Sequence, residues 1–302
     1  MKRSLATLPL LAMILVAVGS IVARKTWFNK PAEATSSWEA ASAFVLPNLQ
    51  PGDAITTYPE WDRAGFPSLE PKSEFMLHRD PILAEDLQKT ERLWVITPTD
   101  RRDEALAALP FPSPKPTLEQ REGIVTVMLF SVPEELHWEL ELADLLDKAI
   151  VEHGDRDKLA GCKGFDKQRQ TWRCPQRGRV SLEERDMGKS ARTCLEVAFG
   201  KEKSSNTTRI TFKDVPLGQT LRLRAGWSLE SLRKKRERPG ELSWEVTVGG
   251  KSLEARTFET TDAWHLFELD TSSLQGKQDV VLEFHATSPD RTEFCFNGWV
   301  EK

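Results

Sequence analysis

The sequence predicts an α+β protein with two modules: a small α/β layer and then an antiparallel β-sandwich of the jelly-roll type, both after an N-terminal transmembrane helix. Three observations support this fold class. The chain begins with a long uncharged apolar run, its first third places apolar residues at helical spacing, and beyond a proline-rich segment the apolar period becomes two. A chain of 302 residues is long enough for two domains that each bury a core.

The uncharged run covers residues 5–23 and has basic residues on both sides. Its length is just enough for a helix that crosses a bilayer. A signal peptide that is later removed is the alternative, because small residues at positions 17–19 resemble a cleavage site behind a shorter apolar core. We predict an uncleaved membrane anchor in residues 1–25, since the apolar run continues past that site. The rest of the chain is then expected to be exported.

The first module is predicted to span residues 26–117. Trp38, Ala41, Phe44 and Val45 fall at helical spacing, and a Pro-Gly-Asp turn follows them. The expected elements are a helix around residues 38–45, a strand at 54–58, a helix at 82–89, a strand at 93–97 and a helix at 102–109. The second strand, LWVIT, is apolar throughout, as in strands that are buried on both faces of a sheet. Residues 110–116 are rich in proline and are predicted to be a stiff linker.

The second module is predicted to span residues 118–302 and to be a β-sandwich. Two early strands are expected at 123–130 and 136–142. Seven later strands are expected at 194–199, 208–212, 221–227, 243–250, 264–270, 279–284 and 293–299. Apolar and polar residues alternate in them: Leu221 and Leu223 face inward, while Arg222 and Arg224 face outward. Turn-forming residues separate the strands at short intervals, which is typical of a sandwich or jelly roll.

The four cysteines predict the compartment. Strand parity places Cys194 and Cys295 on the face opposite the core, in the first and last of the later strands, where a disulfide can form if those strands pair. Cys162 and Cys174 would then close a short loop. Four cysteines allow three pairings, so the sequence leaves the connectivity open. The alternative, a zinc site, is disfavoured because no CxxC occurs, and no metal is expected. Paired cysteines indicate an oxidising compartment, the periplasm or the cell surface if the protein is bacterial.

Composition and motifs argue against several function classes. The formal net charge is only -4, so no strong positive field favours nucleic acid. The hydrolase motif GxSxG and the metalloprotease motif HExxH are absent. Asp262 and His265 could exchange a proton, but His265 shares its strand face with Phe267 and Leu269, which favours an ordinary strand histidine. We therefore expect no enzyme, no cofactor and no nucleic-acid partner.

Two groups of residues are candidate ligand-binding sites. The first follows the first strand and consists of Glu60, Trp61, Asp62 and Arg63. An aromatic ring beside charges suits a sugar, and an ordinary polar loop is the alternative. The second consists of Trp227 and the basic residues Arg233, Lys234, Lys235, Arg236 and Arg238. This cluster predicts a site for an acidic polysaccharide, a phosphorylated saccharide or lipid headgroups, and a solvated loop is the alternative.

The stretch WEAASAFVLPNLQPGDAITTYPEW, followed by ERLWVITP, resembles the soluble extracytoplasmic region of bacterial glycosyltransferases related to dolichyl-phosphate-mannose mannosyltransferases. The resemblance covers about residues 35–117. Those enzymes carry many membrane helices and place their catalytic acidic residues in a loop between early ones. This chain has one apolar run and no such loop. The resemblance therefore implies the outer appendage of such an enzyme without its catalytic part.

Residues 193–302 resemble a galactose-binding-like jelly roll, as found in carbohydrate-binding modules. The resemblance rests on WEVTVGG, on WHLFELDTSSLQGKQDVVLEF and on the closing FCFNGW. Together the two resemblances imply a non-catalytic binding or scaffolding protein, anchored in the membrane with its soluble part outside the cytoplasm. Its partner would be a saccharide or an envelope protein. The alternative is an accessory subunit of a lipid-linked-sugar glycosyltransferase system.

Overall fold

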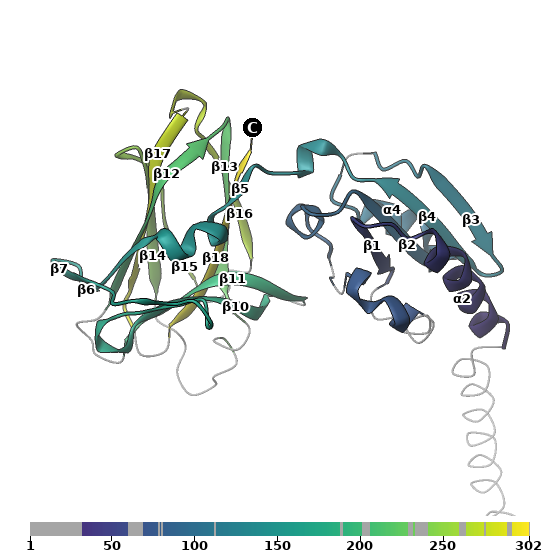
Figure 1. The fold of residues 1–302 in the computed structure, drawn as a ribbon, viewed down its shortest axis with the longest axis horizontal. Coiled ribbons are helices and arrows are strands. Elements are labelled where there is room, and N and C mark those ends of the chain that lie inside the picture. Colours follow the sequence, from purple (N-terminus) through teal and green to yellow (C-terminus); the bar gives the residue numbers. More distant parts are fainter. Residues whose placement is uncertain are drawn as a thin grey trace, which may run out of the picture. The chain divides into compact units, whose positions relative to one another are not determined.

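The computed structural model describes residues 32–59, 69–77, 79, 81–111, 113–187, 190–200, 206–228, 232, 241–259, 264–274, 276–288 and 292–301. The chain divides into two compact units (Figure 1). The first contains Met1–His78 and Ile82–Val132, and the second contains Arg79–Pro81 and Pro133–Lys302. The apolar run 5–23 lies outside the described residues. Within the described ranges no helix has the length and apolar character that a membrane crossing requires, so the anchor stays a prediction.

The first unit is a four-stranded sheet covered by a helix. The strand order is β1 (Asp53–Thr57), β2 (Arg92–Pro98), β4 (Val125–Ser131) and β3 (Leu118–Glu122). Only the β1–β2 pair is parallel. Helix α2 (Ala32–Val45) packs Trp38 and Ala41 in one buried cluster with Trp94 and Val127 of the sheet. Strand β2 is buried along its whole middle, as its apolar sequence predicts.

Four predictions for the first unit and for the segment that follows it need correction. The strand expected at 123–130 forms as β4, but it pairs with β2 and therefore belongs to the first unit. The units divide after Val132, so the proline-rich segment does not separate them. The expected helix at 82–89 is only a 3-10 turn, Ala84–Leu87, whereas the expected helix at 102–109 forms as α4 (Arg102–Ala107). The expected strand at 136–142 shrinks to β5 (Leu140–Glu141) between two 3-10 helices.

The second unit is an antiparallel β-sandwich of two sheets, whose layers are visible in Figure 1. The eight-stranded sheet has the order β16-β13-β18-β11-β10-β9-β8, and β5 also pairs with β18. Its strands are β5, β8 (Phe165–Asp166), β9 (Thr171–Arg173), β10 (Arg179–Met187), β11 (Ser190–Ala198), β13 (Thr220–Trp227), β16 (His265–Asp270) and β18 (Glu293–Glu301). The six-stranded sheet has the order β15-β14-β17-β12-β6-β7. Its strands are β6 (Ile150–Asp155), β7 (Lys158–Gly161), β12 (Thr207–Leu217), β14 (Leu242–Val248), β15 (Lys251–Phe258) and β17 (Gly276–Ala286).

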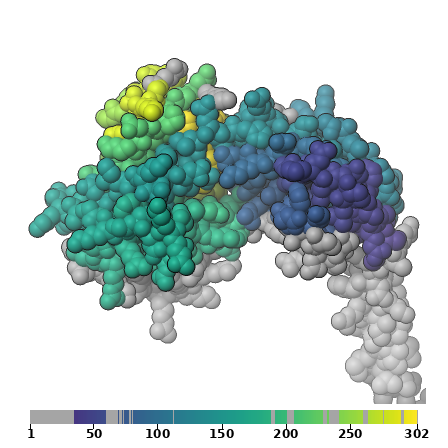
Figure 2. Space-filling model, in the orientation of Figure 1, coloured from purple at the N-terminus to yellow at the C-terminus, as the bar shows by residue number. Residues whose placement is uncertain are grey.

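All seven later strands predicted from alternation are present, as β11, β12, β13, β14, β16, β17 and β18. Their inward residues form one core; Leu221, Leu223, Trp244 and Val246 are among its buried members. Strands β6–β10 and β15 were not predicted. Figure 2 shows that the segment containing β6–β10, in teal and green, forms much of the near surface of the second unit.

Both predicted disulfides are formed: Cys162–Cys174 and Cys194–Cys295. The second joins β11 to β18, which pair in antiparallel register, and its Cα atoms are 5.6 Å apart. As predicted, it lies on the face of the sheet opposite the core, where Met187 and Trp264 pack against it. The two disulfides indicate that the protein folds in an oxidising compartment.

Glu196, on the same outer face, is fully buried between two arginines. Arg179 Nη2 donates to its Oε1 at 2.5 Å, and Arg185 Nε donates to its Oε2. Burial alone would raise the pKa of Glu196, but the hydrogen bonds and charges of Arg185 and Arg179 hold it below its ordinary value. Because the folded-state pKa is lowered, the contribution of this carboxylate to stability is present at neutral pH and is lost as the pH falls through that value.

His153, on β6, is buried inside the sandwich with 1% of its surface exposed. Its Nδ1 lies 2.9 Å from Thr208 Oγ1. Its ring covers Gly178, where an added Cβ would come within 2.5 Å of the imidazole, so only glycine fits beneath it. Burial lowers the pKa of His153 to about 4, and the imidazole is therefore neutral at physiological pH.

The two disulfides are predicted to differ in their contribution to stability. They close segments of 101 and 12 residues. In the chain-entropy description the long closure stabilises by about 4–5 kcal/mol and the short one by about 3 kcal/mol. The double variant Cys194→Ala/Cys295→Ala should therefore lower the free energy of unfolding more than Cys162→Ala/Cys174→Ala. Urea unfolding followed by tryptophan fluorescence measures both, and an equal or reversed effect contradicts this account.

Because of His153, we expect the free energy of unfolding to depend on pH between about 6.5 and 4. The unfolded histidine takes up a proton near pH 6.5, whereas the folded one does so only near 4. Protonation thus favours the unfolded chain, and stability should fall on the order of 3 kcal/mol as the pH decreases across this window. In His153→Gln the slope of unfolding free energy against pH should be shallower there. A slope in this variant equal to that of the wild type contradicts the account.

Candidate functional site on the six-stranded sheet

The outer face of the six-stranded sheet carries two rows of polar side chains that cross its strands. One row contains Ala255, Glu245, Glu283, Arg209 and Glu152, contributed in order by β15, β14, β17, β12 and β6. The next row contains Thr257, Ser243, His285, Thr207 and Gly154. These residues face outward because the positions between them, such as Trp244 and Phe284, fill the core.

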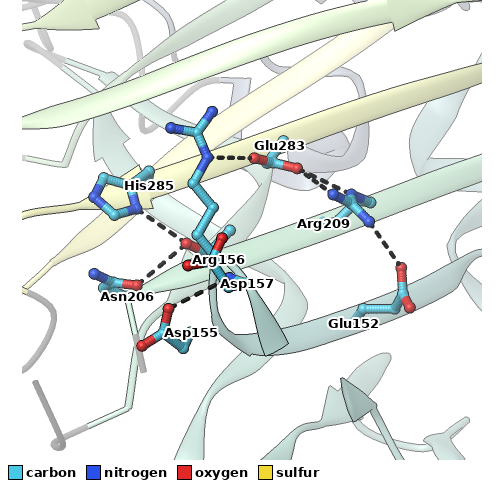
Figure 3. A network of polar contacts seen from close by, with 9 residues as sticks. Glu152, Asp155, Arg156, Asp157, Asn206, Arg209, Glu283 and His285 are labelled. Carbon is cyan, nitrogen blue, oxygen red and sulfur yellow. Dashed lines mark hydrogen bonds and ion pairs between the residues drawn. The ribbon is translucent and has the colours of Figure 1, made fainter. Parts of the chain in front are cut away.

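Glu283 is the centre of the charged network in this face (Figure 3). Arg209 lies between Glu283 and Glu152; its Nη2 is 2.7 Å from Glu283 Oε2 and its Nη1 is 3.7 Å from Glu152 Oε2. Arg156, from the β6–β7 turn, reaches Glu283 Oε1 at 3.4 Å. The two guanidinium groups offset the repulsion that Glu283 and Glu245 exert as directly opposed like charges.

The second row fixes the hydrogen-bonding state of His285. Thr207 Oγ1 donates to Asn206 Oδ1 at 3.2 Å, which uses the only hydroxyl proton of Thr207. His285 Nδ1, 3.0 Å from the same Oγ1, is therefore the donor in that contact. In the neutral imidazole this leaves Nε2 as an acceptor. Figure 3 shows His285 and Asn206 side by side at this end of the network.

A pocket of about 290 Å³ opens on this face. Its lining residues are Arg156, Ser243, Trp244, Glu245, Ala255, Arg256, Thr257, Glu283 and His285. The charged groups that face it are those of Arg156, Glu245 and Glu283. Arg256 lies opposite Trp244 in register and so faces the other side of the sheet, where its guanidinium packs over Phe258 and Phe267. Glu245 makes no ion pair or hydrogen bond with any side chain in the described part of the chain, which leaves its carboxylate available. The volume lies at the small end of the range for ligand pockets, about 300–1,000 Å³.

The lining suits reversible recognition of a ligand with many hydroxyl groups. Glu245 and His285 supply acceptors, Arg156 supplies donors, and the hydroxyls of Ser243 and Thr257 can do either. A metal centre is not formed by the residues that the structure describes, because no three of their His, Cys, Asp and Glu side chains gather closely enough to hold an ion.

The structure places the predicted ligand-binding residues elsewhere. Trp227 is a core residue with 2% of its surface exposed; its Nε1 donates to the Glu259 carbonyl and its ring packs edge-on against Phe294. The prediction that Trp227 contacts a ligand is therefore corrected, because a ring inside the sandwich offers no face to a sugar. The remaining candidates all lie outside the described residues: Glu60, Trp61, Asp62, Arg63, Arg233, Lys234, Lys235, Arg236 and Arg238.

Sequence reasoning missed the residues of the pocket. Alternation in SWEVTV and DVVLEFHA does mark Glu245, Glu283 and His285 as outward-facing. It does not reveal that β14 and β17 are neighbours in a register that sets Glu245 opposite Glu283. Arg156 lies in the turn of a hairpin that was not predicted, and its side chain completes the network only through that turn.

Comparisons of the sequence with known protein families and with curated proteins give no match. The expected likeness of residues 35–117 to membrane glycosyltransferases thus stays a prediction.

Several solved structures are similar to this chain at low identity. Carbohydrate-binding module CBM51-2, solved with GlcNAc and INT domains from Clostridium perfringens ZmpB, is 10% identical with a TM-score of 0.32; the match covers 59% of this chain and 34% of that one. CBM51 from Clostridium perfringens GH95, in complex with methyl-galactose, is 9% identical with a TM-score of 0.28, and the match covers 39% of this chain and 79% of that one. CBM27-1 from Caldicellulosiruptor saccharolyticus, in complex with mannohexaose, is 10% identical with a TM-score of 0.30, and the match covers 40% of this chain and 80% of that one.

In the first of these structures the matched region is about a third of the solved chain. TM-scores near 0.3 describe a loose likeness, and neither a ligand nor a fold family follows from them. The assignment of a β-sandwich rests on the strand pairing itself.

Proposed function

We propose that this protein is a non-catalytic, membrane-anchored extracytoplasmic protein whose β-sandwich binds a neutral saccharide in the pocket of the six-stranded sheet. The observation that carries the proposal is the polar lining of that pocket: the Glu245 carboxylate, which pairs with no described side chain, stands beside the hydroxyls of Ser243 and Thr257. Glu283 is already paired with Arg156 and Arg209, so the wall has no excess of positive charge that would favour a polyanion. It matches a neutral ligand whose closely spaced hydroxyls both donate and accept hydrogen bonds.

The geometry of the sheet supports the proposal. Ser243, Glu245, Glu283 and His285 project from the paired strands β14 and β17, in neighbouring rows of one register. Strand-borne side chains lose little conformational freedom when a ligand binds, so a weakly apolar site can still select its ligand. The ion pairs of Arg156 and Arg209 hold Glu283 in place, which leaves Glu245 to accept ligand hydroxyls.

The disulfides and the apolar run together support the proposed location. The oxidised cysteines support an exported sandwich. Residues 5–23 are proposed to hold the chain in the membrane, where a tethered sandwich would meet envelope saccharides. No nucleophile, metal group or cofactor enters this proposal, because reversible binding requires none.

Glycan-array screening of the full chain, followed by calorimetric titration of the tightest neutral oligosaccharide, tests the proposal. Glu245→Gln should weaken that affinity about tenfold or more, because a hydrogen bond to a charged acceptor contributes roughly 1.5–3 kcal/mol. Ser243→Ala should cause a smaller loss in the same direction. Affinity should change little between low and high salt, since the ligand carries no charge.

Glu254→Gln is the matched control. Glu254 lies on the neighbouring strand β15 opposite Val246, whose side chain faces the core, so it belongs to the other face of the sheet. The charge lost is the same, and affinity should stay at the wild-type value. The proposal fails if no neutral glycan binds, or if Glu245→Gln and Ser243→Ala both bind the selected glycan as tightly as the wild type.

A further inference from the structure

A second and larger cavity, of about 930 Å³, lies elsewhere in the second unit. Its lining residues are Glu134, Glu135, Leu136, His137, Trp138, Glu139, Pro216, Arg222 and Glu301. None of them belongs to the first pocket. One segment, residues 134–139, forms most of the wall, and strands β13 and β18 supply Arg222 and Glu301 from the outer face of the eight-stranded sheet.

The wall is held firmly in place. The Glu139 N–H donates to the Val300 carbonyl at 3.0 Å, which ties the segment to the end of β18. Trp138 stacks on Trp299, with ring centroids 5.0 Å apart and an interplanar angle of 19°. Figure 1 shows this part of the chain beside the C-terminal end of β18. The cavity is therefore preformed.

The charge of this cavity is strongly negative. Four glutamates line it against a single cation, Arg222. That cation is already engaged, because its Nη1 lies 2.8 Å from Glu301 and its Nη2 lies 2.8 Å from Glu268. Glu134 and Glu135 make no ion pair or hydrogen bond with a described side chain. Burial raises the pKa of Glu301, Arg222 partly offsets this, and the nearby Glu268 raises it further, as expected where negative charge is uncompensated.

The wall also contains donors that the protein leaves unused. Trp138 has 9% of its surface exposed, and its buried indole Nε1–H has no hydrogen-bond partner among the described residues. Within the same part of the chain, the buried Nε of Arg222 has none either. Buried donors are normally satisfied, so two in the lining of one cavity indicate that an acceptor is supplied from outside.

We propose that this cavity is a second binding site, selective for an amino sugar: a saccharide with a protonated primary amine beside its hydroxyl groups. The ammonium group pairs with the carboxylates of Glu134, Glu135 and Glu301, and the hydroxyl oxygens accept from the indole and guanidinium donors. A metal ion does not fit, because among the described residues no three carboxylates or imidazoles gather at coordination distance.

A lysine side chain is the competing source of an ammonium group. It places one charge at the end of an apolar stem and requires an apolar channel to hold that stem. The cavity instead spreads its carboxylates over two elements, residues 134–139 and β18, and its apolar lining beside the indole is limited to Leu136 and Pro216. A compact ligand with several polar groups uses such a wall more fully.

The test is calorimetric titration of the full chain at pH 6 with a glucosamine tetramer, its fully N-acetylated counterpart and a blocked tetralysine peptide. The glucosamine tetramer should bind at least tenfold more tightly than the other two. Its affinity should fall as salt is added and as the pH is raised to deprotonate the amine. In Glu134→Gln/Glu135→Gln the affinity should drop at least tenfold. Both side chains are exposed, so this variant is expected to fold normally.

Glu245→Gln separates this site from the first pocket. It should leave glucosamine binding unchanged, and Glu134→Gln/Glu135→Gln should leave neutral-glycan binding unchanged, so the two proposals can fail independently. The amino-sugar site is overturned if the glucosamine tetramer does not bind, or if the acetylated tetramer binds equally well. It is also overturned if tetralysine binds as tightly as the glucosamine tetramer, or if the double variant retains wild-type affinity.

Discussion

The sandwich depends on the position of its last strand. β18 lies between β13 and β11, so the eight-stranded sheet is complete only when the end of the chain has been inserted. Cys295 on this strand is bonded to Cys194, 101 residues earlier in the chain. The pairing is highly non-local, and the loop-closure entropy that it costs is large before any contact compensates it. The disulfide removes much of that cost from the folded state by restricting the unfolded chain.

The outer faces of the two sheets carry the polar features of the sandwich, and they are built differently. On the eight-stranded sheet, Glu196 is buried between Arg179 and Arg185 directly opposite Cys295 in register, which is a structural ion pair beside the disulfide. On the six-stranded sheet, Glu283 is held in a similar way by Arg209 and Arg156, but its neighbour Glu245 pairs with no side chain that the structure describes. The same arrangement, a carboxylate between two arginines, thus occurs on both faces, and on the six-stranded sheet it lies beside the pocket proposed to bind a ligand.

Charge separates the two cavities. In the sheet-face pocket Glu283 is paired with Arg156 and Arg209, and one further carboxylate, Glu245, faces the pocket. The cavity beside β18 instead sets four glutamates against one arginine that is already paired. This difference in charge is the basis for proposing a neutral polyhydroxylated ligand for one site and a cationic ligand for the other. The described residues of the first unit line neither cavity, so both sites belong to the second unit alone.

The sequence by itself determined the elements whose signal is local. Alternation identified seven strands and their inward faces, and the same parity placed Cys194 and Cys295 on one face. It misplaced β4, because a fully apolar strand indicates burial without indicating which sheet buries it. It read residues 136–142 as one strand, although only two of them pair with β18 and Trp138 stacks on Trp299 instead.

The tertiary structure alone decided where recognition could occur. Trp227 looked like a ligand-binding aromatic, but residue type does not reveal exposure, and the packing of the core buried it. Glu245, Glu283 and His285 are separated by many residues and meet only through the register of β14 and β17. The cavity beside β18 joins residues 134–139 to the last strand of the chain. Side-chain periodicity is a property of one strand, whereas register and strand order are set by long-range pairing, and no local pattern contains them.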